Sequence, residues 1–540
     1  MSMRVSLLGP LVCTLVMVLA TPAPAPAVGL EPGWPRTTGY SVSQSGVAAQ
    51  FDDDPQWEIG IASQDGYAYV YNHDGTLVAG WPRYMGSALW PDQYAYFCSS
   101  PAAVDLDADG RDELVVGNFD GRLYAFQRDG TALPGFPVTL SFMTFSSPAC
   151  GDIDGDERLE IVLGDNHGYV YAFNHDGTPC AGFPYSTPYV CRNSPALGDL
   201  DGDGLDEIAI TVDNSDYNLV VLDGNGTMLP GFPLLIGVSG AGASPSFADL
   251  DHDGQLDIVI GARDGTLHCL RRDGTYLPGW PLDAGYSTHS SAAIANLDAD
   301  PELEFALGMN DSNVRVYNHD GTLLPGWPQP TSYSVFSSPS IGDLDGDGAP
   351  EIVVGENTGK VYAWEIDGTP LPGFPLLDAT YTIYASPLLE DLDLDGHLEL
   401  LVGCNDTRIY CWDMGPDTYT ADGLAWPKWR CHVDNDATLP VLDPAGAPET
   451  LAGAPALRVW PNPLRETASI AYRREAPGAV ALTLHDALGR AVRHLEAAAP
   501  AGTILWDGRD EQGRAVPAGL YVMRLTAGAT TRTARVLVLR

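Results

Sequence analysis

The fold of this chain can be derived from residues 338–355, which read SPSIGDLDGDGAPEIVVG. Two short apolar segments flank an acidic, glycine-rich loop, and the second segment begins at Glu351. The unit continues with KVYAW at 360–364, a DGT turn at 367–369 and PGFP at 372–375. Asp-Gly turns between apolar segments are typical of β-hairpins, because glycine accepts the positive φ that such turns require. The stretch therefore predicts a small antiparallel sheet.

The same succession recurs along the chain, which is the signature of a repeat architecture. Its acidic loop begins at Gln50, in a degenerate copy, and then at Asp105, Asp152, Asp199, Asp249, Asn296, Asp343 and Asp391. The intervals between successive starting residues are 55, 47, 47, 50, 47, 47 and 48 residues. A closing Gly-Trp-Pro or Gly-Phe-Pro recurs at Trp81, Phe136, Phe183, Phe232, Trp280, Trp327 and Phe374, and Ala425-Trp426-Pro427 completes the series. The sequence thus contains eight units.

Each unit offers four short strands. In the second copy we expect them at Pro101–Val104, Glu113–Gly117, Arg122–Gln127 and around Leu133–Val138. Eight such units describe the blades of an all-β propeller, with seven blades and a divergent piece as the alternative. A linear stack is the structural rival, but a closed ring hides strand edges that a stack leaves exposed. The extra Pro32-Gly33-Trp34-Pro35 ahead of the first unit is a candidate for closing the ring.

The acidic loops carry the most specific chemistry in the sequence. Six fit the pattern D-x-D-x-D-x-x-x-[DE], and a seventh has an amide in first place. Carboxylates at alternate positions of a tight loop converge on one point, and their repulsion favours a divalent cation there. Hard oxygen ligands in a flexible loop suit Ca²⁺ better than Mg²⁺. The expected ligands are Asp105, Asp107, Asp109 and Glu113; Asp152, Asp154, Asp156 and Glu160; Asp199, Asp201, Asp203 and Glu207; Asp249, Asp251, Asp253 and Asp257; Asn296, Asp298, Asp300 and Glu304; Asp343, Asp345, Asp347 and Glu351; and Asp391, Asp393, Asp395 and Glu399.

We expect about six to eight calcium ions with a structural role, one per well-formed loop. The copy at Gln50, Asp52, Asp54 and Glu58 departs furthest from the pattern and is expected to bind weakly or not at all. An EF-hand is excluded, because the last acidic ligand stands at position nine instead of twelve and strands flank the loop. Ions that belong to the repeat itself are predicted to be folding cofactors that hold each first hairpin.

On these residues the repeat resembles the FG-GAP (VCBS-type) repeat of integrin α-subunit propellers and of many bacterial surface proteins, over about Leu30–Asp436. The resemblance implies a calcium-bearing propeller outside the cell. Integrin propellers have seven blades, so the eight copies here depart from that pattern, and no partner-binding residue of an integrin is carried over.

A ligand is expected on the face opposite the calcium loops. In a four-stranded blade the second and fourth connections share that face, and here they combine aromatic side chains with amides and carboxylates. Such groups can stack on sugar rings and bond their hydroxyls, although packing between blades is the alternative role for any single aromatic. The candidates are Tyr84, Trp90, Tyr94, Tyr96, Asn118, Asp120, Asn166 and His167, accompanied by the aromatics Phe142, Tyr185, Tyr189, Tyr286, Tyr333 and Tyr381.

The net charge of −43 argues against nucleic acid and anionic membrane surfaces as partners, because like charges would repel. The charge is distributed unevenly. Residues 458–540 contain 12 Arg, no Lys and seven acidic residues, which is +5, so the rest of the chain carries −48. This difference in net charge indicates that the chain contains two domains of different character.

The N-terminus has the features of an export signal, with Arg4 before an apolar run at Val5–Ala20 and small residues at Ala25-Pro26-Ala27. We expect residues 1–27 to be removed and the propeller to occupy 28–436. An uncleaved anchor is the alternative, but the run of about 16 residues is short for a bilayer. No transmembrane segment is therefore expected.

The C-terminal part is predicted to be a separate small domain. Residues 437–456 are rich in Ala, Pro and Gly, which indicates a linker, and 457–540 offer seven short strands of a β-sandwich. Residues 459–463 (VWPNP), 486–490 (DALGR), 506–508 (WDG) and 517–521 (PAGLY) resemble the FlgD-like Ig domain and the related sorting domain of type IX secretion. That likeness implies export and attachment to the outer surface of a bacterium.

Eight cysteines follow the signal, and an even number in an exported protein permits disulfides. Cys404 with Cys411 and Cys180 with Cys191 are the preferred local pairs, among 105 connectivities.

The leading hypothesis for function is a non-enzymatic adhesion module that binds a glycan or an extracellular protein. A polysaccharide-degrading enzyme is the rival, since rhamnogalacturonan lyases of one family use an eight-bladed, calcium-bearing propeller. The chain has no G-x-S-x-G and no H-E-x-x-H, and no catalytic carboxylate pair can be told from the calcium loops. A structural spacer is the third reading.

Overall fold

The computed structural model describes residues 28–415, 424–431 and 435–439, apart from 53, 87–97, 108, 110, 157, 188, 214–217, 238–241, 299, 301, 378–380 and 429. Beyond 456 it describes seven strands and residues 490, 508, 509, 514 and 516. The described residues contain no helix. In this part of the chain there is accordingly no helix with the length and apolar character needed to cross a membrane.

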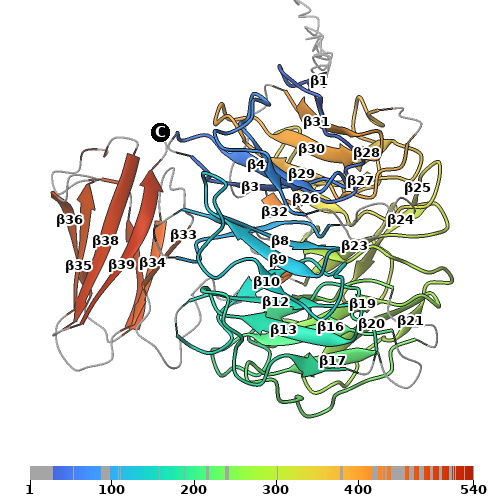
Figure 1. Ribbon diagram of the computed structural model, residues 1–540, viewed down its shortest axis with the longest axis horizontal. Coiled ribbons are helices and arrows are strands. Elements are labelled where there is room, and N and C mark those ends of the chain that lie inside the picture. Colours follow the sequence, from blue (N-terminus) through green and yellow to red (C-terminus); the bar gives the residue numbers. More distant parts are fainter. Residues whose placement is uncertain are drawn as a thin grey trace, which may run out of the picture.

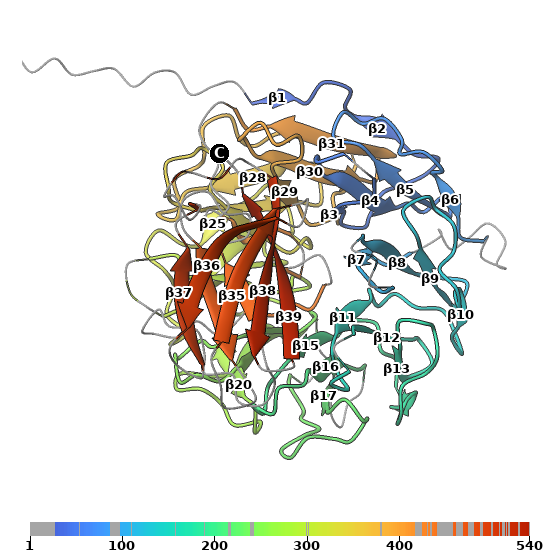
Figure 2. The ribbon, with the colours of Figure 1, turned by 90° about the vertical axis from the view of Figure 1, so that its left-hand side faces the viewer.

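Residues 47–413 fold into eight small antiparallel sheets, each built mainly from consecutive strands (Figure 1). The first four contain β3 (Val47–Ala49), β4 (Glu58–Ala62), β5 (Tyr67–Tyr71) and β6 (Arg83–Tyr84); β7 (Ala102–Val104), β8 (Glu113–Asn118), β9 (Arg122–Phe126) and β10 (Val138–Thr139); β11 (Ala149–Gly151), β12 (Glu160–Gly164), β13 (Tyr169–Phe173) and β14 (Tyr185–Ser186); and β15 (Ala196–Gly198), β16 (Glu207–Thr211) and β17 (Leu219–Leu222). The last four contain β18 (Ser246–Ala248), β19 (Asp257–Gly261), β20 (Thr266–Arg271) and β21 (Leu282–Asp283); β22 (Ala293–Ala295), β23 (Glu304–Gly308), β24 (Asn313–Asn318) and β25 (Gln329–Pro330); β26 (Ser340–Gly342), β27 (Glu351–Gly355) and β28 (Val361–Trp364); and β29 (Leu388–Glu390), β30 (Glu399–Cys404) and β31 (Arg408–Asp413). Figure 2 shows these sheets arranged around one axis, with first strands such as β3, β7 and β11 innermost, which is the architecture of a β-propeller.

Each sheet is buried on both of its faces. Along β8, Leu114 and Val116 pack against the first sheet, whereas Val115 packs against the third. Successive side chains of a strand point to opposite faces, so a strand between two neighbouring sheets needs apolar residues at every position. This explains why the second strands read as continuous apolar runs such as EIVVG.

The fourth strand of the second sheet is shorter and later than the sequence predicts. The expected strand is Leu133–Val138, but β10 spans only Val138–Thr139. Residues 134–137 form a turn in which Gly135 has a φ of +97°. Both Pro134 and Pro137 lack an N–H to donate to a neighbouring strand. The Pro-Gly-Phe-Pro motif is therefore the turn that precedes the strand.

These proline-glycine turns join each sheet to the next. A Cβ on Gly135 would lie 1.9 Å from the backbone oxygen of Asp176, in a turn of the third sheet, so only glycine fits. Where the motif contains tryptophan, its indole N–H donates to the same turn, as Trp81 does to the backbone oxygen of Arg128 at 2.9 Å. The motif thus fixes the spacing between neighbouring sheets.

The N-terminal segment closes the ring. Strands β1 (Gly29–Leu30) and β2 (Arg36–Thr37) pair with β31 and supply the outer edge of the eighth sheet. Between them, Trp34 donates to the backbone oxygen of His73 in the first sheet at 2.8 Å. The candidate Pro32-Gly33-Trp34-Pro35 segment therefore makes the contact between the last sheet and the first.

The prediction that Ala425-Trp426-Pro427 ends the eighth unit is wrong. Trp426 lies in β32 (Leu424–Trp426), which pairs with β26, the first strand of the seventh sheet. Because the N-terminal segment already fills the outer edge of the eighth sheet, this later segment enters the axial channel instead. Residues 435–439 follow it there, and Thr438 bridges to Phe247 in β18. The first three residues of the predicted linker, 437–439, thus belong to the ring.

The C-terminal part contains β33 (Leu457–Trp460), β34 (Ala468–Arg473), β35 (Val480–Asp486), β36 (Ala491–Ala497), β37 (Ala501–Trp506), β38 (Gly519–Ala527) and β39 (Thr530–Val538). They form one sheet of three strands, in the order β33-β34-β37, and one of four, in the order β36-β35-β38-β39. The side chain of Trp506 is fully buried and donates to the backbone oxygen of Arg509 at 3.0 Å.

The preferred disulfides are not formed, and all eight described cysteines are buried and take part in no disulfide. Cys404 packs with the seventh sheet and Cys411 with the first, so the two side chains lie on opposite faces of the eighth sheet. The Sγ atom of Cys191 lies 3.4 Å from Oγ1 of Thr187 and is not bonded to Cys180.

Candidate functional site

The acidic loops connect the first strand of each sheet to the second. In the seventh sheet β26 ends at Gly342, Asp343 opens the loop, and β27 begins at Glu351. The other seven sheets repeat this arrangement, with the second strand beginning at the acidic residue of position nine. The sequence pattern therefore predicts correctly which loop carries the carboxylates and where that loop ends.

Backbone N–H groups inside each loop fold the carboxylates inward. In the loop at Asp199, the N–H groups of Gly202 and Gly204 donate to the two Asp199 carboxylate oxygens at 2.7 and 3.0 Å. Carboxylate oxygens of Asp199, Asp201 and Asp203 come within 4.8 Å of one another. Carboxylate oxygens approach one another equally closely in three more loops: Asp105, Asp107 and Glu113; Asp152, Asp154 and Asp156; and Asp249, Asp251 and Asp257. It also unites Asp52, Asp54 and Glu58, in the loop expected to bind weakly.

The carboxylate at position nine is only half satisfied by the protein. In the loops of Glu58, Glu160 and Glu304, Oε2 accepts a backbone N–H at 2.6, 3.1 and 2.7 Å. None of the residues that the structure describes donates to Oε1 of these three fully buried side chains. A buried, unpaired polar atom costs about 1–3 kcal/mol, and more when it is charged. A cation within the loop would remove this cost, so the donor set fits Ca²⁺.

Burial raises the pKa of these carboxyls, and the charges of the loop aspartates add to the effect. The pKa rises to about 7 for Glu58 and Glu304. It rises to about 8 for Glu113, Glu160, Glu207 and Asp257, and to about 9 for Glu351 and Glu399. Without a cation, these groups therefore favour the protonated form near neutral pH.

With a chelator present, we expect the melting temperature to fall as the pH rises from about 6 to about 9. The folded-state pKa values of about 7–9 lie above the ordinary value of 4.5. The stabilisation that these raised pKa values give to the folded state is therefore complete when the pH is below the unfolded-state pKa. It is lost as the pH rises through the folded-state pKa values. Calcium competes with protons, so the rise in melting temperature that it causes should be larger at pH 9 than at pH 6.

Differential scanning fluorimetry across this pH range checks the prediction. The double variant Glu160→Gln/Glu207→Gln should have a shallower slope in chelator. Asp283→Asn, at an exposed acid outside the loops, should leave the slope unchanged. A melting temperature that rises with pH in chelator would contradict the assignment of the buried carboxyls.

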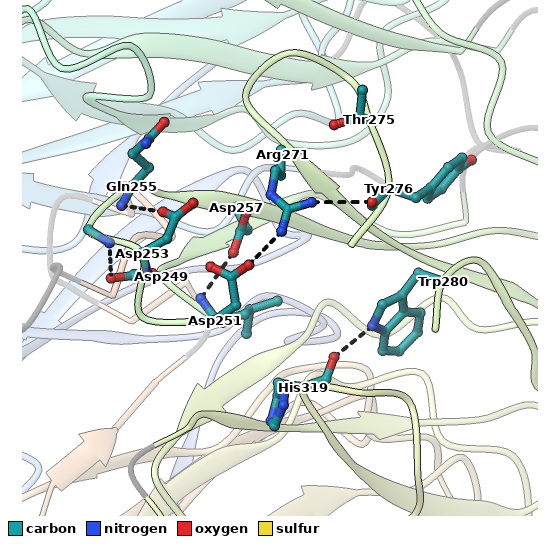
Figure 3. A network of polar contacts seen from close by, with 12 residues as sticks. Asp249, Asp251, Asp253, Gln255, Asp257, Arg271, Thr275, Tyr276, Trp280 and His319 are labelled. Carbon is teal, nitrogen blue, oxygen red and sulfur yellow. Dashed lines mark hydrogen bonds and ion pairs between the residues drawn. The ribbon is translucent and has the colours of Figure 1, made fainter. Parts of the chain in front are cut away.

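In the loop of the fifth sheet an arginine pairs with one of the loop carboxylates (Figure 3). Arg271, at the end of β20, donates to Oδ2 of Asp251 at 2.7 Å. Asp257 replaces the usual glutamate, and its Oδ2 accepts the N–H of Leu250 at 3.1 Å. The guanidinium supplies part of the positive charge that a cation would bring, which lowers the electrostatic repulsion among the carboxylates of this loop.

The opposite face carries the predicted ligand residues, and several of them are engaged within the fold. Asn118 is buried, with its Nδ2 donating to the backbone oxygen of Met85 at 3.0 Å. Asp120 accepts from the hydroxyl of Tyr124 at 3.1 Å. Asp–Tyr contacts of the same kind join Asp65 to Tyr69 and Asp406 to Tyr410, both at 2.6 Å. These acids brace the turn between second and third strands.

Other predicted ligand residues are accessible. Tyr84 is 52% exposed, and His167 is exposed with its ring stacked on Phe142 at a centroid distance of 4.4 Å. Asn166 is half-buried next to it. Trp90, Tyr94 and Tyr96 lie outside the described residues.

Aromatic residues recur at one position of the fourth connection, five residues before the serine that precedes each first strand. They form what we call the aromatic crown: Tyr40, Phe142, Tyr189, Tyr286, Tyr333 and Tyr381. The five tyrosines are exposed, and Tyr286, Tyr333 and Tyr381 are each 56% exposed. An exposed tyrosine offers a ligand a flat apolar face and a hydroxyl, and here the same group recurs from sheet to sheet. The crown is therefore a candidate binding surface.

A ring of serines around the axis was not anticipated from the sequence. Ser45, Ser100, Ser147, Ser194, Ser244, Ser291, Ser338 and Ser386 each stand five residues before the first loop ligand. In seven of the eight neighbouring pairs, all but Ser244 and Ser291, the N–H of one serine donates to the hydroxyl oxygen of the next at 2.8–3.1 Å, and the Ser386 contact to Ser45 joins the last sheet to the first. The sequence does contain a signal for this ring: a serine stands at the same distance before every acidic loop and is usually followed by proline.

Comparisons with known proteins agree with the repeat and with the fold. A family model described as FG-GAP-like repeat matches residues 105–163, 152–210, 199–260, 296–354 and 343–402. No curated protein matches the sequence. Among solved structures, the V. cholerae biofilm matrix protein Bap1 is similar, with a TM-score of 0.53 at 13% identity over 77% of this chain and 97% of that one. The Bacillus licheniformis rhamnogalacturonan lyase PL11 gives a TM-score of 0.50 at 17% identity over 77% and 80%. At these identities the likenesses show the fold alone.

Proposed function

Because the chain carries FG-GAP-like repeats in a β-propeller, we propose that it is a secreted, eight-bladed, calcium-stabilised adhesion module. Its ligand is a glycan, bound on the face opposite the acidic loops. Each of the eight sheets is one blade of this module, and the N-terminal segment completes the eighth.

Calcium is proposed as a folding cofactor of the blades. The support is the half-satisfied carboxylate that opens four of the second strands, at Glu58, Glu160, Glu304 and Glu351, together with aspartates whose oxygens converge within 4.8 Å. The bound ion neutralises the carboxylates and holds the first hairpin of each blade. The loop residues then have no catalytic task, which is consistent with a binding role.

The aromatic crown is the observation that carries the glycan proposal. Its members stand at equivalent positions around the ring, so a repeating ligand can meet the same side chain more than once. Tyrosine offers a flat apolar face for a sugar ring and a hydroxyl for its polar edge. Linked contacts of this kind gain affinity through effective concentration, even when each one is weak.

Replacing Tyr286 and Tyr333 together by alanine should weaken binding to immobilised polysaccharide by about 2–4 kcal/mol, roughly 30- to 1,000-fold, if each ring contributes as a typical hot spot does. Biolayer interferometry on a panel of acidic and neutral polysaccharides measures the change. Leu323→Ala is the matched control, because Leu323 is 40% exposed but follows a turn on the acidic-loop face. It should bind as the parent does.

The same panel separates the proposal from its rivals. Release of unsaturated sugars by the parent protein would indicate a lyase, and capture of a protein with no polysaccharide binding would indicate a protein ligand. An absence of any binding would favour a structural spacer. Equal losses in the tyrosine and leucine variants would also contradict a glycan site on the crown.

We also propose attachment to the outer cell surface through the C-terminal part. Its support is the set of motifs resembling FlgD-like and type IX sorting domains, together with seven strands in two sheets, the arrangement expected of a small sandwich.

A further inference from the structure

A pocket of about 220 Å³ lies on the propeller axis, where the first strands begin. Its wall contains side chains from positions two residues before the ring serines: Phe145, Arg192, His289, Phe336 and Tyr384. The Phe336 and Tyr384 rings are stacked at a centroid distance of 5.9 Å, and the His289 ring meets Phe336 edge-on at 5.0 Å. The volume corresponds to about seven water molecules in the liquid, which is enough for one sugar-sized ring.

The floor of the pocket is polar and points hydroxyls inward. Ser45, Ser100, Ser147, Ser194, Ser244, Ser291, Ser338 and Ser386 all line it. In each contact around the serine ring the hydroxyl oxygen accepts an N–H, so its own proton is left to donate. Gln44 and Asn193 add two amides to the lining. The floor thus offers hydrogen bonds from several directions to a ligand on the axis.

The axial segment lies next to the serine ring, on the side of the prolines that follow it, and holds two cationic side chains within the fold. Asn435 donates to the backbone oxygens of Pro101 and Pro148 at 3.0 and 3.1 Å, and these prolines directly follow ring serines. Arg430 donates in the same layer to the backbone oxygen of Pro245 at 3.3 Å. Lys428 lies beside it, 2.6 Å from Oδ1 of Asn435. Both cationic side chains are buried.

The wall carries positive charge as well. Arg192 and Arg263 share one carboxylate, that of Asp213, at 3.7 and 3.1 Å, so one guanidinium charge is left in excess. The Arg192 side chain is 53% exposed, with its guanidinium 6.0 Å from the centre of the Phe145 ring. A chain of net charge −43 would repel an anion almost anywhere else. Within the described part of the chain, the lining of this pocket contains Arg192 and no acidic residue.

We propose that the axial pocket binds a single pyranose ring that carries a carboxylate. The sugar face lies on Phe336 and Tyr384, the carboxylate pairs with Arg192, and the ring serines bond the hydroxyls. The proposal rests on the glycan-binding function: the crown holds a polysaccharide around the rim, and the pocket selects an acidic unit of it.

Isothermal titration of the calcium-loaded protein with methyl β-D-glucuronide and methyl β-D-glucoside tests this, with the corresponding galactose pair alongside. Within each pair the sugars differ only by a carboxylate in place of a hydroxymethyl group. We expect the acidic member of at least one pair to bind at least about tenfold more tightly than its neutral partner, as a charged hydrogen bond implies. Arg192→Gln should remove that preference, and Phe336→Ala should weaken both sugars.

Arg408→Gln is the matched control, because Arg408 is 52% exposed and 3.7 Å from an aspartate, as Arg192 is, but does not line the pocket. It should bind both sugars as the parent does. Equal binding of acidic and neutral sugars, equal effects of the two arginine variants, or no binding of either acidic sugar would overturn the proposal. If crown variants abolish polysaccharide binding while Arg192→Gln leaves the binding of both sugars unchanged, the result supports the adhesion function and contradicts the acidic-sugar pocket.

Discussion

Removal of calcium should lower the melting temperature of this protein by about 20 °C. An ion at a hundredfold excess over its dissociation constant stabilises the folded state by about 2.7 kcal/mol. Six such loops would supply roughly 16 kcal/mol, as much as the whole stability of an ordinary domain. With an unfolding entropy of about 2.1 cal/mol/K per residue, this stabilisation corresponds to about 20 °C for a propeller of roughly 400 residues.

The physical reason lies in the buried carboxylates. Without an ion, the loops keep several acidic groups within a few ångströms, and at Glu58, Glu160, Glu304 and Glu351 the position-nine carboxylate has an oxygen that the protein leaves unpaired. Scanning calorimetry with excess EDTA and then with calcium restored measures the effect. Magnesium should restore less of it, because its strict octahedron fits an irregular loop poorly. A melting curve that EDTA leaves unchanged would contradict the folding role of the ions.

The second large effect is expected at the closure of the ring. Trp34→Ala should lower the free energy of unfolding by about 3–5 kcal/mol, the usual cost of truncating a buried tryptophan. Trp34 is only 7% exposed, packs edge-on against Tyr71 at 5.8 Å and donates to His73. The N-terminal segment that carries it supplies the outer edge of the eighth sheet and so joins that edge to the first sheet.

Trp81→Ala provides a matched comparison inside the ring. Trp81 is also 7% exposed, meets Phe126 edge-on at 5.7 Å and donates to Arg128 at 2.9 Å. In a closed ring the two substitutions should cost about the same in urea unfolding. If Trp34→Ala proves neutral while Trp81→Ala is costly, the N-terminal segment is not seated on the eighth sheet.

The repeat made the loops predictable in detail. A period of about 47 residues fixes where each first strand ends and each second strand begins, so the junction between Asp343, the loop and Glu351 follows from counting. The seven C-terminal strands were predictable for a similar reason, since turn residues separate short apolar runs. Local patterns of this kind need no knowledge of distant contacts.

Features that depend on distant contacts were missed or misplaced. Trp426 matches the closing motif, yet it lies in the axial channel, because the N-terminal segment had already taken the outer edge of the eighth sheet. Lys428 and Arg430 have the appearance of surface residues in the sequence, and only the ring around them shows that they are buried. Asp120 looked free to bind a ligand, but the register of the next strand brings Tyr124 to it.

The central claim is that the recurring acidic loops are calcium sites on which the fold depends. Elemental analysis of the purified protein after dialysis against metal-free buffer tests it most directly. The account predicts about six to eight calcium ions per chain, and fewer by about one for each loop whose position-nine glutamate is replaced by glutamine. A dialysed, fully folded protein that contains no calcium would contradict it.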